Sequence, residues 1–190
     1  LDAGVAHHLA EPIDVTGNQL AEGGREMRLV VEAFTRMPDK RLVVIGAGPQ
    51  LREIKRIATP NIAVMGYQPH AVLLEHLQKA RAFIFASEED FGIAPIEAMA
   101  CGTPVLAFGK GGATETVIDG ITGLHFFEQS ASAICDVVAK FEAMPVPFDR
   151  ARLRKHAEQF STALFRASFR DFLEARWREH QARLKNVIPF

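Results

Sequence analysis

A strand, a turn, a helix and a second strand follow one another between residues 82 and 108, and this order constrains the fold most. Residues 82–86 and 105–108 are short, continuous apolar runs, which are typical of strands buried on both faces. Between them the chain turns at Gly92, enters a helix and breaks at residues 102–104. Parallel strands need a helical crossover of this kind. We therefore expect an open parallel sheet, in which ligands bind at the carboxyl edge of the strands.

The predicted helix begins without a capping side chain. Pro95 fits the first helical position, because its missing N–H would have no partner there. Ala94 is then the cap residue, and alanine has no side-chain oxygen to accept the next backbone donors. Free N–H groups at a helix start favour an anion, above all a phosphate. The alternative is a helix end that only water caps.

Two carboxylates accompany this helix start. Glu89 lies on the loop before the turn, and Glu97 lies in the first turn of the predicted helix. As a ligand-binding residue Glu97 would accept hydrogen bonds from sugar hydroxyls. Without a ligand, Glu97 is explained by the helix dipole and Glu89 by solvation of an acidic loop.

These residues carry a resemblance to the family 4 retaining glycosyltransferases. Glu89 and Glu97 are separated by seven residues, as in the E-x7-E signature of that family. The combination of residues 89–93 with the glycine-rich residues 109–112 looks most like the mannosyltransferase branch. The match extends over residues 97–105, 111–117 and 119–124.

The resemblance implies the GT-B fold, in which two Rossmann-like domains face each other. The first binds the acceptor and the second binds the nucleotide-sugar, and everything recognisable here belongs to the second. We therefore expect an α/β fold, a Rossmann-like open parallel sheet with helices on both faces. Residues 1–12 are a lead-in, residues 13–145 the donor-binding domain, and residues 146–190 helices that pack on it or on a missing N-terminal acceptor domain. The first residue, Leu1, is not methionine, as expected of a fragment.

By the same resemblance, Glu89 is the candidate catalytic residue, which would hold sugar hydroxyls and steady positive charge at the anomeric carbon. Glu97 would accept hydrogen bonds from the ribose. Backbone N–H groups of the turn would contact sugar and phosphate, and the family places Gly46 beside the nucleotide. Together with Glu97, the substrate-binding candidates are Asp90, Phe91, Gly92, Ile93, Ala94, Gly46, Tyr67, Arg25 and Lys110.

Three of these candidates have simpler explanations. Tyr67, the only tyrosine, would lie against a base, although packing at the rim is commoner for this residue type. Lys110 would offset pyrophosphate charge, or it is an exposed loop lysine. Arg25 would bind phosphate, or it is an exposed charge at a helix end. Glycines 109, 111 and 112 let a backbone come close to a ligand.

The first loop departs from the family pattern. An arginine after the first strand and a lysine at the helix start usually bind the pyrophosphate. This chain has Asn18 and Gln19 near the first position, and Gly23, Gly24 and Arg25 near the second. Loss of a charge-assisted phosphate contact leaves a non-catalytic nucleotide-binding module as an alternative. A sugar-nucleotide epimerase of the same fold is a third hypothesis.

The rest of the chain alternates strands and helices, as an open α/β sheet requires. Pro49 is expected at the first position of its helix, by the same argument as Pro95. Strands are predicted near residues 13–17, 42–45 and 62–65, and helices near residues 25–37, 51–58, 70–80, 130–141, 149–159 and 162–185.

The last predicted helix carries an apolar stripe surrounded by arginines 166, 170, 176 and 178. Such a helix docks on its own domain or on the missing one, or it lies on a membrane surface. The stripe consists of Phe165, Phe169, Phe172, Leu173 and Trp177.

Net charge and cysteine content limit the classes of partner that we expect. A formal net charge of -1 gives no reason to expect nucleic acid, and Cys101 and Cys135 lack metal-ligand spacing. No signal peptide or bilayer-spanning run is present, so we expect a cytoplasmic protein, with a possible peripheral contact at the inner face of the membrane. The resemblance implies a donor substrate, GDP-mannose favoured, and a glycan or lipid-linked acceptor. It requires no cofactor and no metal.

Overall fold

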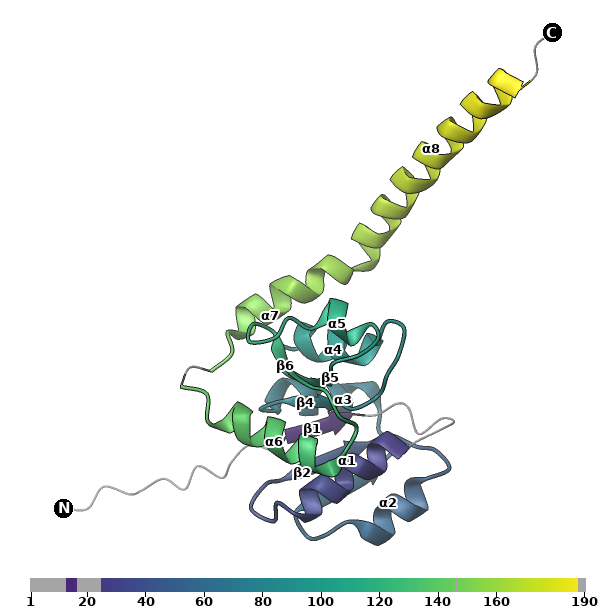
Figure 1. The fold of residues 1–190 in the computed structure, drawn as a ribbon. Coiled ribbons are helices and arrows are strands. Elements are labelled where there is room, and N and C mark those ends of the chain that lie inside the picture. The colour runs from purple at the N-terminus through teal and green to yellow at the C-terminus, as the bar shows by residue number, and fades with distance from the viewer. Residues whose placement is uncertain (1–12, 17–24, 146, 188–190) are drawn as a thin grey trace.

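The computed structural model describes residues 13–16, 25–145 and 147–187. They form a six-stranded, all-parallel sheet covered by helices on both faces, which confirms the predicted fold class (Figure 1). The strands are β1 (Ile13–Thr16), β2 (Leu42–Ile45), β3 (Ile62–Gly66), β4 (Phe83–Phe85), β5 (Val105–Phe108) and β6 (Gly123–Phe126).

The strand order is β3-β2-β1-β4-β5-β6, so the direction of winding reverses between β1 and β4. Residue Asp14 of β1 pairs with Phe83 of β4 at this reversal. Ligands of open α/β sheets bind where the order reverses, outside the carboxyl ends of the strands. The loop that follows β4, which contains Glu89, therefore leaves the sheet at the topological switch point.

Two helical layers bury the two faces of the sheet. Ile84 and Leu106 belong to the core on one face, and Phe83 and Val105 belong to the core on the other. This alternation follows from the period of two in a strand. The first face is covered by α1 (Arg25–Thr35), α2 (Leu51–Ile57) and α6 (Ala131–Glu142), and the second by α3 (His70–Lys79), α4 (Ile93–Ala100), α5 (Ala113–Thr116) and α7 (Arg150–Ala157).

The predicted elements recur with small shifts at their ends. The first helix ends at Thr35 rather than at residue 37. The position predicted for Pro49 is wrong, because α2 begins at Leu51 with Gln50 as its cap. Pro49 instead lies inside a turn that is closed by the N–H of Leu51 donating to the carbonyl of Gly48 (3.1 Å). The fixed φ of proline suits such a turn as well as a helix start.

The C-terminal helices behave differently from each other. Helix α7 packs on the sheet domain through Leu153, which is fully buried beside α4. A short 3-10 turn, η1 (Glu158–Phe160), then leads into α8 (Thr162–Val187), which projects away from the domain (Figure 1). The side chains of the apolar stripe of α8 are 49–64% exposed. The stripe is therefore not buried on the sheet domain among the described residues, and the surface on which it docks stays a prediction.

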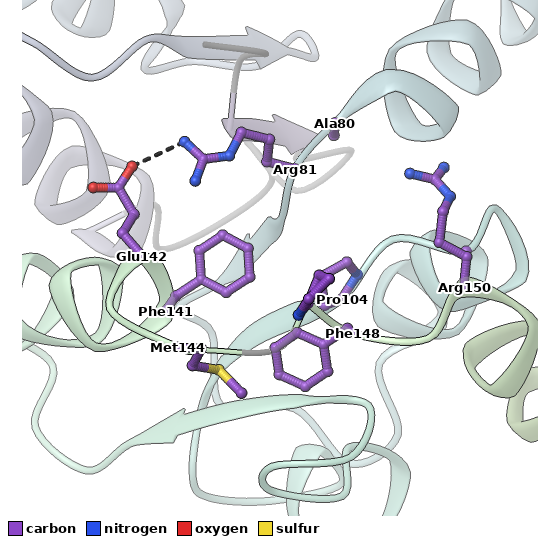
Figure 2. A pocket seen from close by; sticks show the side chains of 10 residues that line it. Ala80, Arg81, Pro104, Phe141, Glu142, Met144, Phe148 and Arg150 are labelled. Atoms are coloured by element: carbon purple, nitrogen blue, oxygen red, sulfur yellow. Dashed lines mark hydrogen bonds and ion pairs between the residues drawn. The ribbon is translucent and has the colours of Figure 1, made fainter.

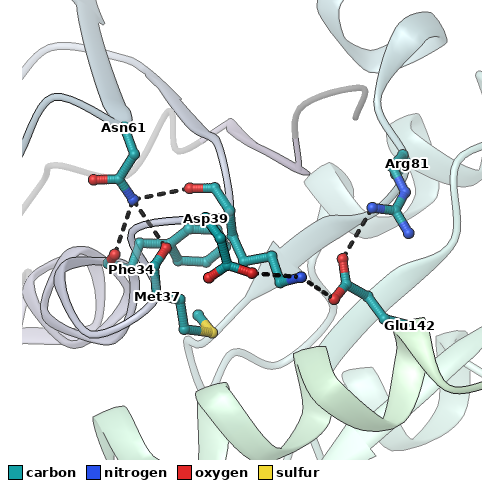
Figure 3. Close-up of polar contacts among 7 residues, drawn as sticks. Phe34, Met37, Asp39, Asn61, Arg81 and Glu142 are labelled. Carbon is teal, nitrogen blue, oxygen red and sulfur yellow. Dashed lines mark hydrogen bonds and ion pairs between the residues drawn. The ribbon is translucent and has the colours of Figure 1, made fainter. Parts of the chain in front are cut away.

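One asparagine closes the connection between α1 and β2. Asn61 Nδ2 lies 2.9, 3.1 and 2.8 Å from the carbonyl oxygens of Phe34, Met37 and Lys40 (Figure 3). The hydroxyl of Thr59 donates to Asn61 Oδ1 (2.6 Å), which fixes the orientation of the amide. Carbonyls at a helix end lack an intrahelical partner, and Asn61 adds a side-chain donor to the backbone N–H groups of Met37 and Lys40, which donate to the carbonyls of Phe34 and Met37.

Next to Asn61, a charge network joins three elements on the amino side of the sheet. Glu142, the last residue of α6, accepts from Lys40 Nζ (2.5 Å) and from Arg81 Nη1 (2.9 Å). Hydrogen bonds to Glu142 and Asp39 raise the pKa of Lys40. Because all three side chains of this network are partly exposed, solvent screens their attraction and its contribution to stability is small.

We expect Asn61→Ala to lower the free energy of unfolding by about 1–3 kcal/mol, because it removes a donor that three carbonyls share and leaves that of Lys40 with no other donor among the described residues. Asn61→Asp should cost more, since a carboxylate oxygen then faces the same carbonyls. Urea unfolding followed by circular dichroism measures both. Thr59→Val is the matched control and should cost about 1 kcal/mol. Equal stability of the Asp variant and the native chain would contradict this role.

Candidate functional site

The turn after β4 leads directly into the helix start. Helix α4 begins at Ile93, and its cap is Gly92, with φ 80° and ψ 84°. The predicted start at Pro95 with Ala94 as cap is therefore wrong by two residues. Pro95 is the third helical residue, where its missing N–H is still without consequence, because the whole first turn lacks intrahelical acceptors. The left-handed conformation that Gly92 adopts is open to glycine without a steric penalty.

The expectation of an uncapped helix start is confirmed. No side chain caps α4, and the N–H groups of Ile93 and Ala94 donate to no group in the described residues. Ile93 is 65% exposed, so the helix end is open at the carboxyl edge of the sheet. The partial positive charge of such an end favours a phosphate or another anion.

Glu89 carries the strongest sign of an absent partner. Its side chain is half-buried, and Oε1 is fully buried without a hydrogen-bond partner among the described residues. Buried polar atoms nearly always have a partner, and a water, an ion or a ligand hydroxyl could supply the one that this oxygen needs. The only other such atom in the described chain is Oε1 of Gln50, at the start of α2. The sequence contains no signal for Gln50 beyond its place after the turn that follows β2.

Glu97 lies on another element and in another environment. It is exposed, and as the fifth residue of α4 it lies in the second helical turn rather than in the predicted first one. The helix dipole therefore explains this carboxylate less well than expected, since the effect fades beyond the first turn.

Burial raises the pKa of the nearby Cys101 thiol, and the charge of Glu97 adds to this shift. The thiol is thus protonated and is no candidate nucleophile.

Aromatic packing supports the turn from the C-terminal side. The rings of Phe91 and Phe160 meet edge to face with centroids 5.9 Å apart. Phe160 packs in turn on His156 (5.5 Å), whose Nε2 lies 2.8 Å from the carbonyl oxygen of Thr116 and donates to it. Residues of η1, α7 and α5 therefore fix the side chain of Phe91. Asp90, between Glu89 and Phe91, is exposed.

The remaining candidates lie along the same edge of the sheet. Tyr67 follows β3 and is 77% exposed. Lys110 follows β5, is exposed, and has its Nζ 5.5 Å from the ring centroid of Phe108. Gly46 follows β2, but its N–H already donates to the carbonyl of Gly66 (2.9 Å), so this N–H is not available to a ligand.

Residues 17–24, which form the first loop, lie outside the described part of the chain. Arg25 is the first residue of α1, and its side chain lies outside the described part of the chain. Asn18, Gln19, Gly23 and Gly24 also lie outside the described residues. Their predicted relation to a pyrophosphate stays a prediction.

A pocket of about 300 Å³ lies at the opposite, amino edge of the sheet (Figure 2). Arg81 and Pro104, which line it, come just before β4 and β5. The stacked rings of Phe141 and Phe148 form another part of its wall. This pocket is therefore separate from the residues that gather at the carboxyl edge.

Neither a metal cluster nor a membrane span occurs in the described residues. No three His, Cys, Asp or Glu side chains among them are grouped to hold a metal ion. Of the helices in residues 25–145 and 147–187, none is long and apolar enough to cross a bilayer. The predicted independence from metal stays a prediction.

The fold and the site together define a class: an open α/β domain with an uncapped helix start at its topological switch point. The family model for glycosyl transferases group 1 matches residues 25–160. The chain therefore belongs to this family, and its fold is one half of a GT-B fold.

Relatives specify the branch. The chain is 33% identical over 141 residues to a GDP-mannose-dependent alpha-(1-6)-phosphatidylinositol monomannoside mannosyltransferase from Mycolicibacterium smegmatis, covering 64% of this chain and 36% of that protein. It is 32% identical over 203 residues to a D-inositol 3-phosphate glycosyltransferase from Mycobacterium leprae, covering 92% and 46%.

Among solved structures, a sucrose-phosphate synthase from Thermosynechococcus elongatus is 28% identical, with a TM-score of 0.66. The match covers 91% of this chain and 46% of that one. The chain thus spans less than half the length of each of these three proteins. The resemblance to mannosyltransferases is confirmed, and the site residues stay predictions.

Proposed function

We propose that this chain is the donor-binding domain of a retaining glycosyltransferase that transfers mannose from GDP-mannose to a glycan or lipid-linked acceptor. The observation that carries the proposal is the orphaned Oε1 of Glu89, which lies on the loop that leads into the uncapped start of α4. A nucleoside-diphosphate sugar offers both missing partners, since its hydroxyls donate to a carboxylate and its diphosphate accepts from N–H groups.

In this proposal, the two carboxylates bind different parts of one donor. Glu97, exposed on α4, accepts from the ribose hydroxyls, and Glu89 holds the mannose and steadies positive charge at the anomeric carbon. The N–H groups at the start of α4 stabilise the departing diphosphate, whose negative charge grows as the glycosidic bond breaks. The acceptor hydroxyl attacks the anomeric carbon from the face that the diphosphate leaves, and its proton passes to the departing phosphate oxygen.

A double displacement by these two carboxylates is not part of the proposal. Retaining glycosidases place both carboxyl groups about 5 Å apart around one bond. Here Glu89 lies on a loop, and Glu97 lies a full turn inside a helix. A front-face substitution needs no second carboxylate at the anomeric carbon, and so it fits this arrangement better.

The choice of GDP-mannose has support from the relatives alone. The relative from Mycolicibacterium smegmatis is named as GDP-mannose-dependent. A non-catalytic nucleotide-binding module is the second candidate, because the first loop lacks the arginine and lysine of the family pattern.

Calorimetry on the chain with GDP-mannose, GDP and UDP-glucose tests the proposal. We expect binding of GDP-mannose and GDP, with weaker binding of UDP-glucose. Turnover is then assayed in a protein that also contains the acceptor-binding domain. Binding without turnover there would favour the non-catalytic module, and absence of any nucleotide binding would exclude both.

We further propose that α8 packs on that acceptor-binding domain. Its stripe of five large apolar side chains has no cover in the described residues, and the relatives are more than twice as long as the matched region. Burial of one such side chain contributes about 1.5–3 kcal/mol, so a partner surface would be bound strongly.

One prediction of the proposed function concerns the two carboxylates. Glu97→Ala should weaken GDP binding about 10-fold or more, because it removes a hydrogen-bonded charge. Glu89→Ala should leave GDP affinity nearly unchanged and abolish turnover. Calorimetry and a mannose-transfer assay measure the two effects. Glu88→Ala, which removes an exposed acid from the same loop, is the control and should change neither. Equal effects of both variants on binding would refute these roles.

Another prediction concerns the packing of α8. The double variant Phe169→Asp, Phe172→Asp should bind the separately produced N-terminal domain at least about 10-fold more weakly than the native chain, because two central apolar contacts are lost. Ala167→Asp with Ala175→Asp, at exposed positions of the same helix, is the matched control. Sedimentation with anionic phospholipid vesicles tests the alternative. Unchanged domain binding, or cosedimentation of the native chain with vesicles, would contradict the proposal.

A further inference from the structure

The loop that contains Glu89 lies against the glycine-rich loop that follows β5, and the two backbones meet with no side chain between them at Gly111 and Gly112. The N–H of Gly112 donates to the carbonyl of Glu89 over 2.7 Å. A Cβ atom on Gly112 would lie 2.4 Å from the carbonyl oxygen of Asp90 and 2.6 Å from Cα of Phe91. A Cβ atom on Gly111 would lie 2.4 Å from the carbonyl oxygen of Glu89. The glycine-rich loop, residues 109–112, therefore lies directly against the backbone of residues 89–91. Only residues without a side chain at positions 111 and 112 permit so close an approach.

The backbone dihedral angles of residue 112 do not themselves require glycine. Its φ of -61° and ψ of -21° are helical, which alanine adopts more readily than glycine. The three nearest atoms that a Cβ would meet there belong to the backbone of Asp90 or Phe91 and have no rotamer through which to move away. An alanine at this position can be accommodated only if the turn moves.

We propose that Gly111 and Gly112 are positioning residues for the carboxylate of Glu89. Their lack of side chains lets the loop after β5 hold the backbone of residues 89–91 in place, and this fixes where Glu89 meets the donor sugar. The inference rests on the proposed function, because Glu89 is the sugar-binding group there. Misplacement of a reacting group by about 1 Å costs about 100-fold in rate, so the contact sets turnover more than binding.

The test is Gly112→Ala, with Gly120→Ala as the matched control. Gly120 has a positive φ of 73°, unlike Gly112, and a Cβ there would meet nothing within 4 Å. A crystal structure of each variant locates the backbone of residues 89–91. Calorimetry measures GDP affinity, and a transfer assay in the protein with both domains measures kcat and KM.

We expect Gly112→Ala to fold, to show a displaced turn, to lose about 100-fold in kcat and to change GDP affinity by less than about 5-fold. Gly120→Ala should keep the turn and kcat, although it melts at a lower temperature because of its strained backbone. An unmoved turn, an unchanged kcat or a Gly112→Ala protein that does not fold would overturn the proposal. Absence of nucleotide binding by the native chain would instead refute the proposed function, and the crystal structure would still decide whether the contact places the turn.

Discussion

Strands β4 and β5 bury every side chain on both of their faces, because helices cover the sheet from each side. Polar chemistry is therefore confined to the edges of the sheet. The register, with Phe83 opposite Val105 and Phe85 opposite Ala107, brings the ends of these two strands to the same level. The loops that follow them must meet, and the contact between Gly112 and Glu89 is the result. The position of the candidate site thus follows from burial in the sheet more than from any property of the acidic loop.

Much of this arrangement was predictable from local sequence. Strands buried on both faces need apolar residues at every position, and residues 42–45 and 105–108 satisfy this requirement over their whole length. The position of Glu89 after such a strand placed it at the carboxyl edge. The start of α4 was harder to predict, since proline is tolerated throughout the first turn. The left-handed backbone of Gly92, packed against the ring of Phe85, decided between the allowed starts.

Other features depend on partners that a local pattern does not contain. The sequence indicated that residues 109–112 permit a close approach and suggested a ligand as the partner. The structure shows that Gly111 and Gly112 approach the backbone of the Glu89 loop, which is about twenty residues away along the chain. The orphaned oxygen of Gln50 was missed for the same reason, because burial of one side-chain atom depends on the whole loop environment. The stripe on α8 was recognised, but nothing among the described residues covers it.

Helix α4 can act on an anion only if its start is held rigidly, because a dipole that reorients during reaction loses most of its effect. The structure fixes it at both ends through one C-terminal segment. Arg150 and Arg154 of α7 donate to the carbonyl of Cys101 at the helix end (3.4 and 3.3 Å), where cations also complement the dipole. Phe160, just after α7, packs on Phe91 at the helix start. A segment that is remote in sequence therefore preorganises the end of α4 at which the diphosphate is proposed to bind.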